Sequence, residues 1–407
     1  MPALPTAAVV TVGTELTTGL RQDTNSTEVT RSLTEAGFRV LETRSVPDDL
    51  PQVESALRAL ASSCDLIVVT GGLGPTHDDI TREAASQALG RPLVRDEYVA
   101  EALRDLAVRH EHAGARTDMF RQADVLEGAD VLAAVTGSAP GQSITVGSTR
   151  VVLLPGPPGE MRPLLARVLA DYDPAIPPAR LRCTGITESD AQQVVQAAIA
   201  GFDVDLTLLA APGDVEVVLF PREDAPADLE PATTAALAAL GHFCYSTDGS
   251  SLAEVVIQRA IAAGEGIATA ESCTGGMIAA ALTDVPGASA TYVGGVVAYA
   301  NEVKMAALDV PPGLLAQFGA VSEETARAMV EGALALPGAT LAVATTGIAG
   351  PDGGSTGKPV GLVWIALGVQ GGPVVASAHK LRGDRAAVRH RAMLIALDLL
   401  RRELMTR

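Results

Sequence analysis

Two neighbouring side chains that could act as nucleophiles, Ser272 and Cys273, lie in the segment GIATAESCTGG, residues 266–276. The apolar start of this segment is typical of a buried strand, and its two glycines indicate a turn into a helix. Ligands bind at the carboxyl ends of strands in open α/β sheets, so this turn is a candidate reaction site. A serine or threonine here could equally be an ordinary helix N-cap.

A serine nucleophile needs a base, and the segment VVAYANEVK, residues 296–304, offers Lys304 just past another expected strand. A desolvated lysine can replace histidine in this role. His379 and His390, the histidines of the expected C-terminal domain, have no adjacent carboxylate or glycine turn. The alternative for Lys304 is a solvated lysine on a helix surface.

Two further segments could bind an anion. Residues 345–361, TTGIAGPDGGSTGKPVG, contain six glycines, which let backbone N–H groups approach a ligand closely. The loop lacks the Lys-Ser/Thr ending of a P-loop. Arginines 382, 385 and 389 in LRGDRAAVRHR could form a fork for phosphate or carboxylate, although surface arginines on a helix would look the same.

Polar residues also follow two expected strands near the start of the chain. The segment 12–26, VGTELTTGLRQDTNS, follows the strand 7–12, and VVTGGLGPTHDDITRE, residues 68–83, begins within the third strand. Its glycines predict a tight turn, Thr76 a helix N-cap, and Asp78 and Asp79 a first helical turn. Acidic residues there are stabilised by the helix dipole. Two carboxylates beside a glycine-rich turn also suit Mg²⁺ bridging a diphosphate.

These segments need sheets to position them, and apolar strands alternate with amphipathic helices through both ends of the chain. We predict an α/β protein with two three-layer α/β domains, whose sheets are largely parallel, joined by a small α+β domain. The prolines after Leu169 suggest a boundary. The expected domains are 1–172, 173–248 and 249–407.

Composition excludes several classes of partner. The net charge of −18 argues against direct nucleic-acid binding and against an anionic membrane, because phosphate contacts need a basic surface. The cysteines are scattered and predict reduced thiols in a cytoplasmic protein. The start of the chain lacks the basic region of a signal peptide, and no apolar run reaches the ~18 residues of a membrane span.

The segments AESCTGG, YANEVK, GAVSEETARAMVEGA, TTGIAGPDGG, KPVG and GDR follow one another between residues 270 and 385. Together they resemble the competence/damage-inducible CinA family. The resemblance implies deamidation of nicotinamide mononucleotide to nicotinate mononucleotide without a cofactor, with Ser272 as nucleophile, favoured over Cys273, and Lys304 as base. It implies N–H groups around Thr274, Gly275 and Gly276 for the oxyanion, and as further substrate-binding residues Tyr299, Asn301, Thr346, Gly347 and Arg385.

The first half resembles molybdopterin-binding domains, and in particular the N-terminal domain of the same family, in the stretches GTEL, GGLGPTHDDITREA and LPGPPGEM. The resemblance implies an ADP-ribose pyrophosphatase that depends on a divalent metal and releases AMP and ribose 5-phosphate. The implied metal ligands are Asp78 and Asp79. The implied substrate-binding residues are Asp23, Asn25, Gly71, Gly72, Gly74 and Thr76.

The leading hypothesis is therefore a bifunctional enzyme of pyridine-nucleotide salvage, expected to act as a homodimer. One alternative is an N-terminal domain that binds a nucleotide or pterin without turnover. The other is an interaction protein of the competence machinery.

Overall fold

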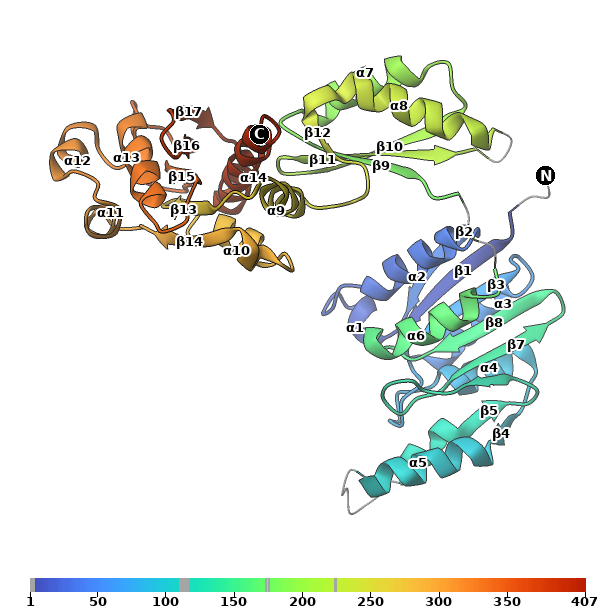
Figure 1. The fold of residues 1–407 in the computed structure, drawn as a ribbon. Helices are drawn as coiled ribbons and strands as arrows, with labels where there is room; N and C mark the ends of the chain where they lie inside the picture. Colours follow the sequence, from blue (N-terminus) through green and yellow to red (C-terminus); the bar gives the residue numbers. More distant parts are fainter. Residues whose placement is uncertain (1–3, 110–116, 173, 175, 223–224) are drawn as a thin grey trace. The chain divides into compact units, whose positions relative to one another are not determined.

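The structure is a computed structural model that describes residues 4–109, 117–172, 174, 176–222 and 225–407. The chain divides into two compact units, Met1–Pro177 and Pro178–Arg407 (Figure 1). Within the second unit, a small antiparallel sheet precedes a larger mixed sheet. The three-domain boundaries at 172 and 248 stay predictions.

The first unit is built on a six-stranded sheet. Its strands run in the order β2 (Arg39–Val46), β1 (Thr6–Val12), β3 (Leu66–Thr70), β8 (Thr149–Leu154), β7 (Gly141–Val146) and β6 (Asp130–Leu132). The first four are parallel, and β7 and β6 are antiparallel to their neighbours. The parallel strands are apolar and buried because helices cover both faces.

Each face of this sheet packs against two helices. Helices α2 (Thr24–Glu35) and α6 (Pro158–Leu169) share one apolar core, and α3 (Leu50–Leu60) and α4 (Thr81–Leu89) share the other. The remaining elements are α1 (Thr14–Thr17), β4 (Leu93–Arg95), α5 (Glu97–Arg109), η1 (Thr117–Ala123) and β5 (Asp124–Leu126).

The second unit opens with the small α+β module. Its antiparallel strands run in the order β10 (Val204–Ala211), β11 (Asp214–Pro221), β9 (Ala179–Thr184) and β12 (Cys244–Ser246). Helices α7 (Glu188–Ile199) and α8 (Leu229–Leu240) share its core, and the short 3₁₀ turns are η2 (Pro226–Asp228) and η3 (Gly241–Phe243).

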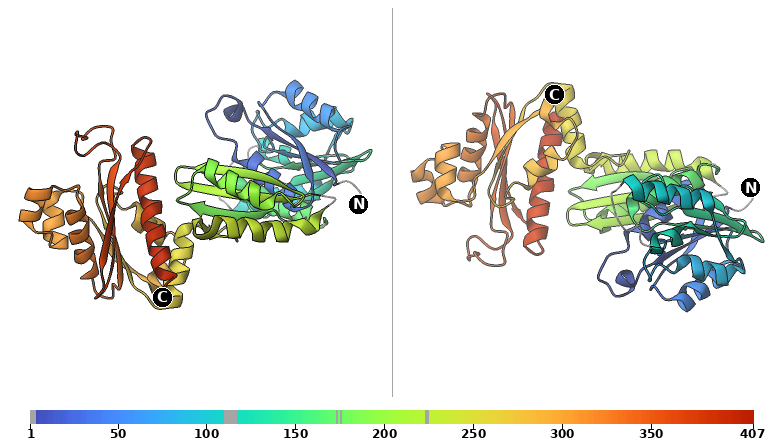
Figure 2. Two further views of the ribbon diagram at one scale, coloured as in Figure 1. Left: turned by 90° about the horizontal axis from the view of Figure 1, so that it is seen from above. Right: turned by 90° about the horizontal axis from the view of Figure 1, so that it is seen from below.

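The larger sheet of this unit has five strands in the order β14 (Tyr292–Val297), β13 (Ile267–Glu271), β15 (Leu341–Gly347), β16 (Leu362–Val369) and β17 (Val374–Lys380). Figure 2 shows helices on both of its faces. One face packs on α9 (Leu252–Ala263), α10 (Met277–Thr283) and α14 (Arg385–Leu404). The other carries α11 (Asn301–Leu308), α12 (Pro312–Phe318) and α13 (Glu323–Leu334), and η4 is Ala288–Ala290.

The predicted α/β class is confirmed, and both large sheets are mixed. In the second, only β14, β13 and β15 are parallel, while β16 and β17 form an antiparallel hairpin. The strand Val374–Lys380 was not predicted. Only residues 370–373 separate it from β16, and so short a connection allows only an antiparallel return. None of the helices in the described part of the chain combines the length and apolarity needed to cross a membrane.

Candidate active site

Ser272 follows β13 directly and lies at the carboxyl end of this buried strand. Its N–H donates to the Thr345 carbonyl on β15 at 2.9 Å, and the Thr274 and Thr345 hydroxyls are 2.7 Å apart. The chain then turns sharply through Gly275 and Gly276, with φ of +62° and +93°, values that glycine adopts at little cost. Ser272 is therefore fixed at the end of β13 by a hydrogen bond to the parallel strand β15. The residue as a whole is 9% exposed.

Lys304, on α11, lies against Ser272. The Ala298 N–H donates to the Glu271 carbonyl at 2.8 Å and ties the end of β14 to the end of β13. Lys304 Nζ is 3.1 Å from Ser272 Oγ, 2.7 Å from the Ala298 carbonyl and 3.2 Å from the Tyr299 carbonyl. A neutral amine has two N–H groups and one lone pair. The two carbonyls can accept both N–H groups, which leaves the lone pair for the Ser272 hydroxyl.

The surroundings of Lys304 favour this neutral form. The side chain is 1% exposed, and no carboxylate within the described ranges forms a salt bridge with it. Burial lowers the pKa of Lys304, against a weaker opposing effect of the Glu302 charge. Burial instead raises the pKa of the Cys273 thiol to about 12. At neutral pH the thiolate needed for nucleophilic attack is therefore rare at Cys273.

Six of the predicted C-terminal site residues meet at one pocket of about 200 Å³, lined by Ser272, Cys273, Tyr299, Lys304, Ala320, Val321, Thr346, Gly347, Ala349 and Arg385. Arg385, at the start of α14, donates to the Gly350 carbonyl and to the Tyr299 hydroxyl, both at 2.9 Å. The Thr346 hydroxyl donates to the Ala320 carbonyl at 2.6 Å and so fixes the opposite wall.

The other predicted residues lie outside this lining. Thr274 is fully buried, Asn301 begins α11 as an exposed residue, and neither they nor Gly275 and Gly276 are among the lining residues. One of the three expected oxyanion donors is wrong, because the Gly276 N–H donates to Glu271 Oε2 at 2.9 Å.

Glu271 occupies the N-terminus of α10, next to the N–H groups expected to bind the oxyanion. Its buried carboxylate also accepts the Ile278 and Ala279 N–H groups, at 3.1 and 2.8 Å. This cap was not predicted, because the sequence of a strand end does not reveal whether its carboxylate faces the pocket or the following helix. Arg389, considered above as part of an anion fork, instead donates to the Cys273 and Thr274 carbonyls.

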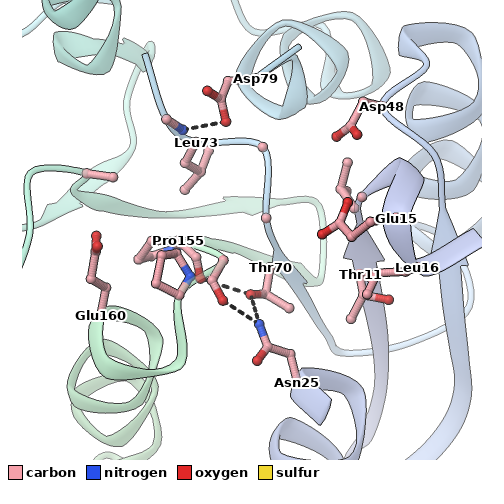
Figure 3. Close-up of a pocket in the computed structure, with 18 of the residues that line it drawn as sticks. Thr11, Glu15, Leu16, Asn25, Asp48, Thr70, Leu73, Asp79, Pro155 and Glu160 are labelled. Carbon is pink, nitrogen blue, oxygen red and sulfur yellow. Dashed lines mark hydrogen bonds between the residues drawn. The ribbon is translucent and has the colours of Figure 1, made fainter. Parts of the chain in front are cut away.

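The N-terminal candidate residues surround a larger pocket of about 1010 Å³ at the carboxyl ends of β1, β3 and β8 (Figure 3). Asp23 caps α2 by accepting the Ser26 N–H, and it also accepts the Thr11 and Ser45 hydroxyls. Burial raises the pKa of Asp23, but these hydrogen bonds together hold it below its usual value. Asn25 donates to the Gly156 carbonyl at 2.7 Å. Both side chains therefore brace the pocket floor.

The glycine-rich loop is held from within by Asp79. Its carboxylate accepts the Gly74 and Thr76 N–H groups, each at 2.7 Å. A side chain at Gly72 would place its Cβ 2.3 Å from Thr81 Oγ1, so the loop packs tightly on α4. The predicted helix N-cap at Thr76 and first helical turn at Asp78 and Asp79 are wrong, because α4 begins only at Thr81. The Asp79 carboxylate closes the preceding loop, a role not expected of a metal ligand.

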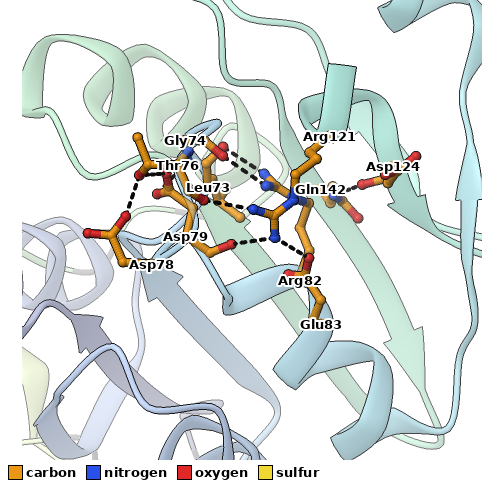
Figure 4. Close-up of polar contacts among 10 residues, drawn as sticks. All are labelled: Leu73, Gly74, Thr76, Asp78, Asp79, Arg82, Glu83, Arg121, Asp124 and Gln142. Atoms are coloured by element: carbon orange, nitrogen blue, oxygen red, sulfur yellow. Dashed lines mark hydrogen bonds and ion pairs between the residues drawn. The ribbon is translucent and has the colours of Figure 1, made fainter. Parts of the chain in front are cut away.

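Two arginines donate hydrogen bonds to backbone carbonyls of the same loop (Figure 4). Arg82 is 2% exposed and donates to the Leu73 and Gly74 carbonyls, at 2.6 and 2.9 Å. Arg121 donates to the Thr76 carbonyl and pairs with Glu83. Neither role was predicted, because arginines that bind backbone carbonyls have no characteristic spacing in sequence.

The pocket is acidic. Six carboxylates and one guanidinium belong to its lining in the described ranges: Glu15, Asp23, Asp48, Asp78, Asp79, Glu160 and Arg21. No group of three or more His, Cys, Asp or Glu side chains among the described residues is close enough to hold a metal alone. Mg²⁺ usually takes only one or two carboxylates and completes its shell with water and phosphate oxygens. Oxygen donors of this kind fit such an ion.

Two family models match this chain. Residues 249–404 match the family described as CinA C-terminal domain, and residues 8–176 match the probable molybdopterin binding domain. The crystal structure of the competence/damage inducible protein CihA from Agrobacterium tumefaciens is 42% identical. It covers 38% of this chain and 97% of its own, with a TM-score of 0.36.

Full-length relatives match both units together. A CinA-like protein of Fervidobacterium nodosum is 35% identical over 401 residues, covering 97% of this chain and 98% of that protein. A CinA-like protein of Akkermansia muciniphila is 39% identical over 413 residues, covering 98% of each. With this identity over nearly the whole of each chain, the protein belongs to the CinA family.

Proposed function

We propose that the C-terminal unit is a serine amidohydrolase that converts nicotinamide mononucleotide to nicotinate mononucleotide and ammonia. One observation carries the reaction class: a buried lysine without a carboxylate partner in the described structure lies 3.1 Å from a serine hydroxyl that lines a pocket. The family resemblance supplies the substrate.

In this reaction Lys304 accepts the Ser272 hydroxyl proton while Oγ attacks the carboxamide carbon. The tetrahedral intermediate collapses, the C–N bond breaks, and Lys304 returns the proton to the departing ammonia. Water then attacks the ester while Lys304 takes its proton. The bond between the acyl carbon and Oγ breaks, Lys304 returns the proton to Ser272 Oγ, and the carboxylate product is released. No metal or organic cofactor takes part in these steps.

The pocket size agrees with this substrate. About 200 Å³ is below the ~300 Å³ of ordinary ligand pockets, so it suits the carboxamide and its ring, with the ribose phosphate outside. Arg385 is exposed beside the pocket and offers a cation to the phosphate. Its hydrogen bond to Tyr299 pre-orients the guanidinium.

Arg385→Ala should therefore raise the KM for nicotinamide mononucleotide about 10- to 100-fold, the equivalent of one charged hydrogen bond, and change kcat by less than about threefold. Steady-state kinetics would measure both constants. Arg382→Ala removes a nearby arginine outside the pocket lining and should leave both constants unchanged. A fall in kcat at constant KM in Arg385→Ala would contradict the phosphate role.

We also propose that the N-terminal unit is a divalent-metal-dependent ADP-ribose pyrophosphatase that yields AMP and ribose 5-phosphate. The acidic pocket supports this, because a diphosphate among six carboxylates needs a cation to offset their repulsion. Asp78 would hold the ion, since Thr76 contacts only one of its oxygens, with Asp79 as a secondary ligand. When bound, the ion would neutralise charge on the diphosphate.

Chelation of divalent metal should abolish AMP release from ADP-ribose. Asp78→Asn should slow it by at least about 100-fold, because loss of a direct ligand should cost no less than loss of a group that orients one. Chromatography of AMP and ribose 5-phosphate measures both effects. Asp105→Asn, an exposed carboxylate outside the pocket, should behave as wild type. Tight ADP-ribose binding without AMP release, at saturating Mg²⁺, would instead favour a nucleotide- or pterin-binding module.

The remaining expectations stay proposals of ours: a homodimer located in the cytoplasm, with neither a membrane nor nucleic acid as a direct partner. The four cysteines are free thiols, which supports a reducing compartment. If folded wild-type protein shows neither the amidase nor the pyrophosphatase activity, an interaction protein of the competence machinery would be favoured.

A further inference from the structure

Two consecutive backbone N–H groups beside Ser272 have no acceptor within the described parts of the chain. They belong to Thr274 and Gly275. The Cys273 N–H contacts its own thiol, and the Ser272 and Gly276 N–H groups donate to the Thr345 carbonyl and to Glu271. Buried N–H groups are nearly always paired, and Thr274 is fully buried. Unpaired N–H groups next to a candidate nucleophile indicate that a ligand oxygen is their partner.

One side chain, that of Arg389, binds two carbonyl oxygens of the same short segment. Arg389, one turn into α14, donates from Nε to the Cys273 carbonyl at 3.1 Å and from Nη2 to the Thr274 carbonyl at 2.7 Å. Arg389 is not among the residues that line the pocket. Arg389, which the sequence suggested as part of an anion-binding fork, therefore binds the backbone that follows the nucleophile.

These two hydrogen bonds from Arg389 determine the direction of the N–H groups in the same peptide units. The carbonyl of one residue and the N–H of the next belong to one planar trans peptide unit and point in opposite directions. The Cys273 and Thr274 carbonyls face Arg389, so the N–H groups of Thr274 and Gly275 face away from it. A single guanidinium fixes both peptide units, because its N–H groups are held in a rigid fork.

The charge of Arg389 also reaches the reacting atoms. No carboxylate in the described ranges forms a salt bridge with it, so its charge is not neutralised locally. That charge acts on the neighbouring Cys273 thiol, lowering its pKa against the larger, raising effect of burial. A positive charge behind the peptide units that hold an oxyanion stabilises the tetrahedral intermediate more than the neutral carboxamide.

We propose that Arg389 is a positioning residue for the oxyanion hole: it orients the N–H groups of Thr274 and Gly275 toward the oxygen of the tetrahedral intermediate. This inference rests on the proposed amidase function. It removes Gly276 from the expected set of donors and assigns Arg389 to catalysis through the backbone, with no contact to the substrate phosphate.

The test compares Arg389→Ala, Arg389→Lys and Arg391→Ala with nicotinamide mononucleotide as substrate. Arg389→Ala should lower kcat about 100-fold, the lower range for loss of one oxyanion-hole donor, with KM within about threefold. Arg389→Lys should recover less than about tenfold of this loss, because an ammonium cannot reproduce the planar fork. Arg391, two residues along the helix and bonded to the Arg382 carbonyl, should tolerate alanine.

Added ethylguanidinium at millimolar concentration should restore part of kcat in Arg389→Ala and none in Arg391→Ala, which a purely structural role would not produce. Wild-type turnover with unchanged kcat in Arg389→Ala, or a loss confined to KM, would overturn this inference alone. A kcat loss that follows a lower Tm and resists ethylguanidinium would also overturn it. Absence of turnover in wild type would overturn both this inference and the proposed function.

Discussion

Ser272→Ala should abolish release of ammonia from nicotinamide mononucleotide, with kcat reduced by at least about 10³-fold, while the Tm changes little. The reason is that Oγ forms the covalent bond, and no other group in the pocket can replace it. Among the described residues, Lys304 Nζ is the one side-chain group hydrogen-bonded to Ser272 Oγ, so removal of the hydroxyl should cost little stability. Coupled detection of ammonia and differential scanning fluorimetry would measure both effects.

Cys273→Ala is the matched control, because the two residues are adjacent and both line the pocket. The Cys273 side chain is 5% exposed within an apolar core, and its thiol, with a pKa of about 12, is protonated near neutral pH. The variant should keep most of its kcat and lose some stability through the cavity it leaves. An inactive Cys273→Ala with a normal melt, beside an active Ser272→Ala, would reverse the assignment.

The kcat/KM for nicotinamide mononucleotide should rise with pH as Lys304 loses its proton. Only the neutral amine can accept the Ser272 proton, and burial disfavours the charged form. The pKa of Lys304 in the folded protein therefore lies below the ordinary lysine value of 10.5, and activity should be lost as pH falls through that pKa. A pH–rate profile from about pH 6 to about pH 10 would locate the midpoint.

Two variants make this assignment specific. Lys304→Arg should lower kcat by about 10²- to 10⁴-fold at every pH, because a guanidinium stays protonated. Glu302→Gln removes the exposed charge that raises the pKa of Lys304, and should move the profile to lower pH with little change in its plateau. A profile that falls with rising pH, or a midpoint insensitive to both variants, would exclude Lys304 as the base.

The sequence predicted well those features that follow from strand ends. Ser272 and Lys304 are 32 positions apart, yet both follow neighbouring parallel strands, whose carboxyl ends meet at one edge of a sheet. The family resemblance also implied Arg385 and Thr346, and both line this pocket. Periodicity and glycine turns indicate the positions of Ser272 and Lys304, because they report which edge of the sheet a residue occupies.

Such patterns could not predict the direction in which individual side chains and peptide groups point. Glu271 lies directly before Ser272 but points to the N–H groups of α10, and Arg389 binds carbonyls where an anion was expected. The Glu271 contact depends on how the chain turns from β13 into α10, and the Arg389 contact joins residues over 100 positions apart in the chain. Asp79 is a similar case in the first unit, since its carboxylate closes the loop that carries it.

The central claim is tested most directly by incubating the full-length protein with nicotinamide mononucleotide and quantifying ammonia and nicotinate mononucleotide, for wild type and Lys304→Ala. We predict that wild type releases the two products in equal amounts and that Lys304→Ala, equally folded, releases neither at a measurable rate. Equal turnover by both proteins would contradict the Ser–Lys mechanism. No turnover by wild type would contradict the amidase function itself.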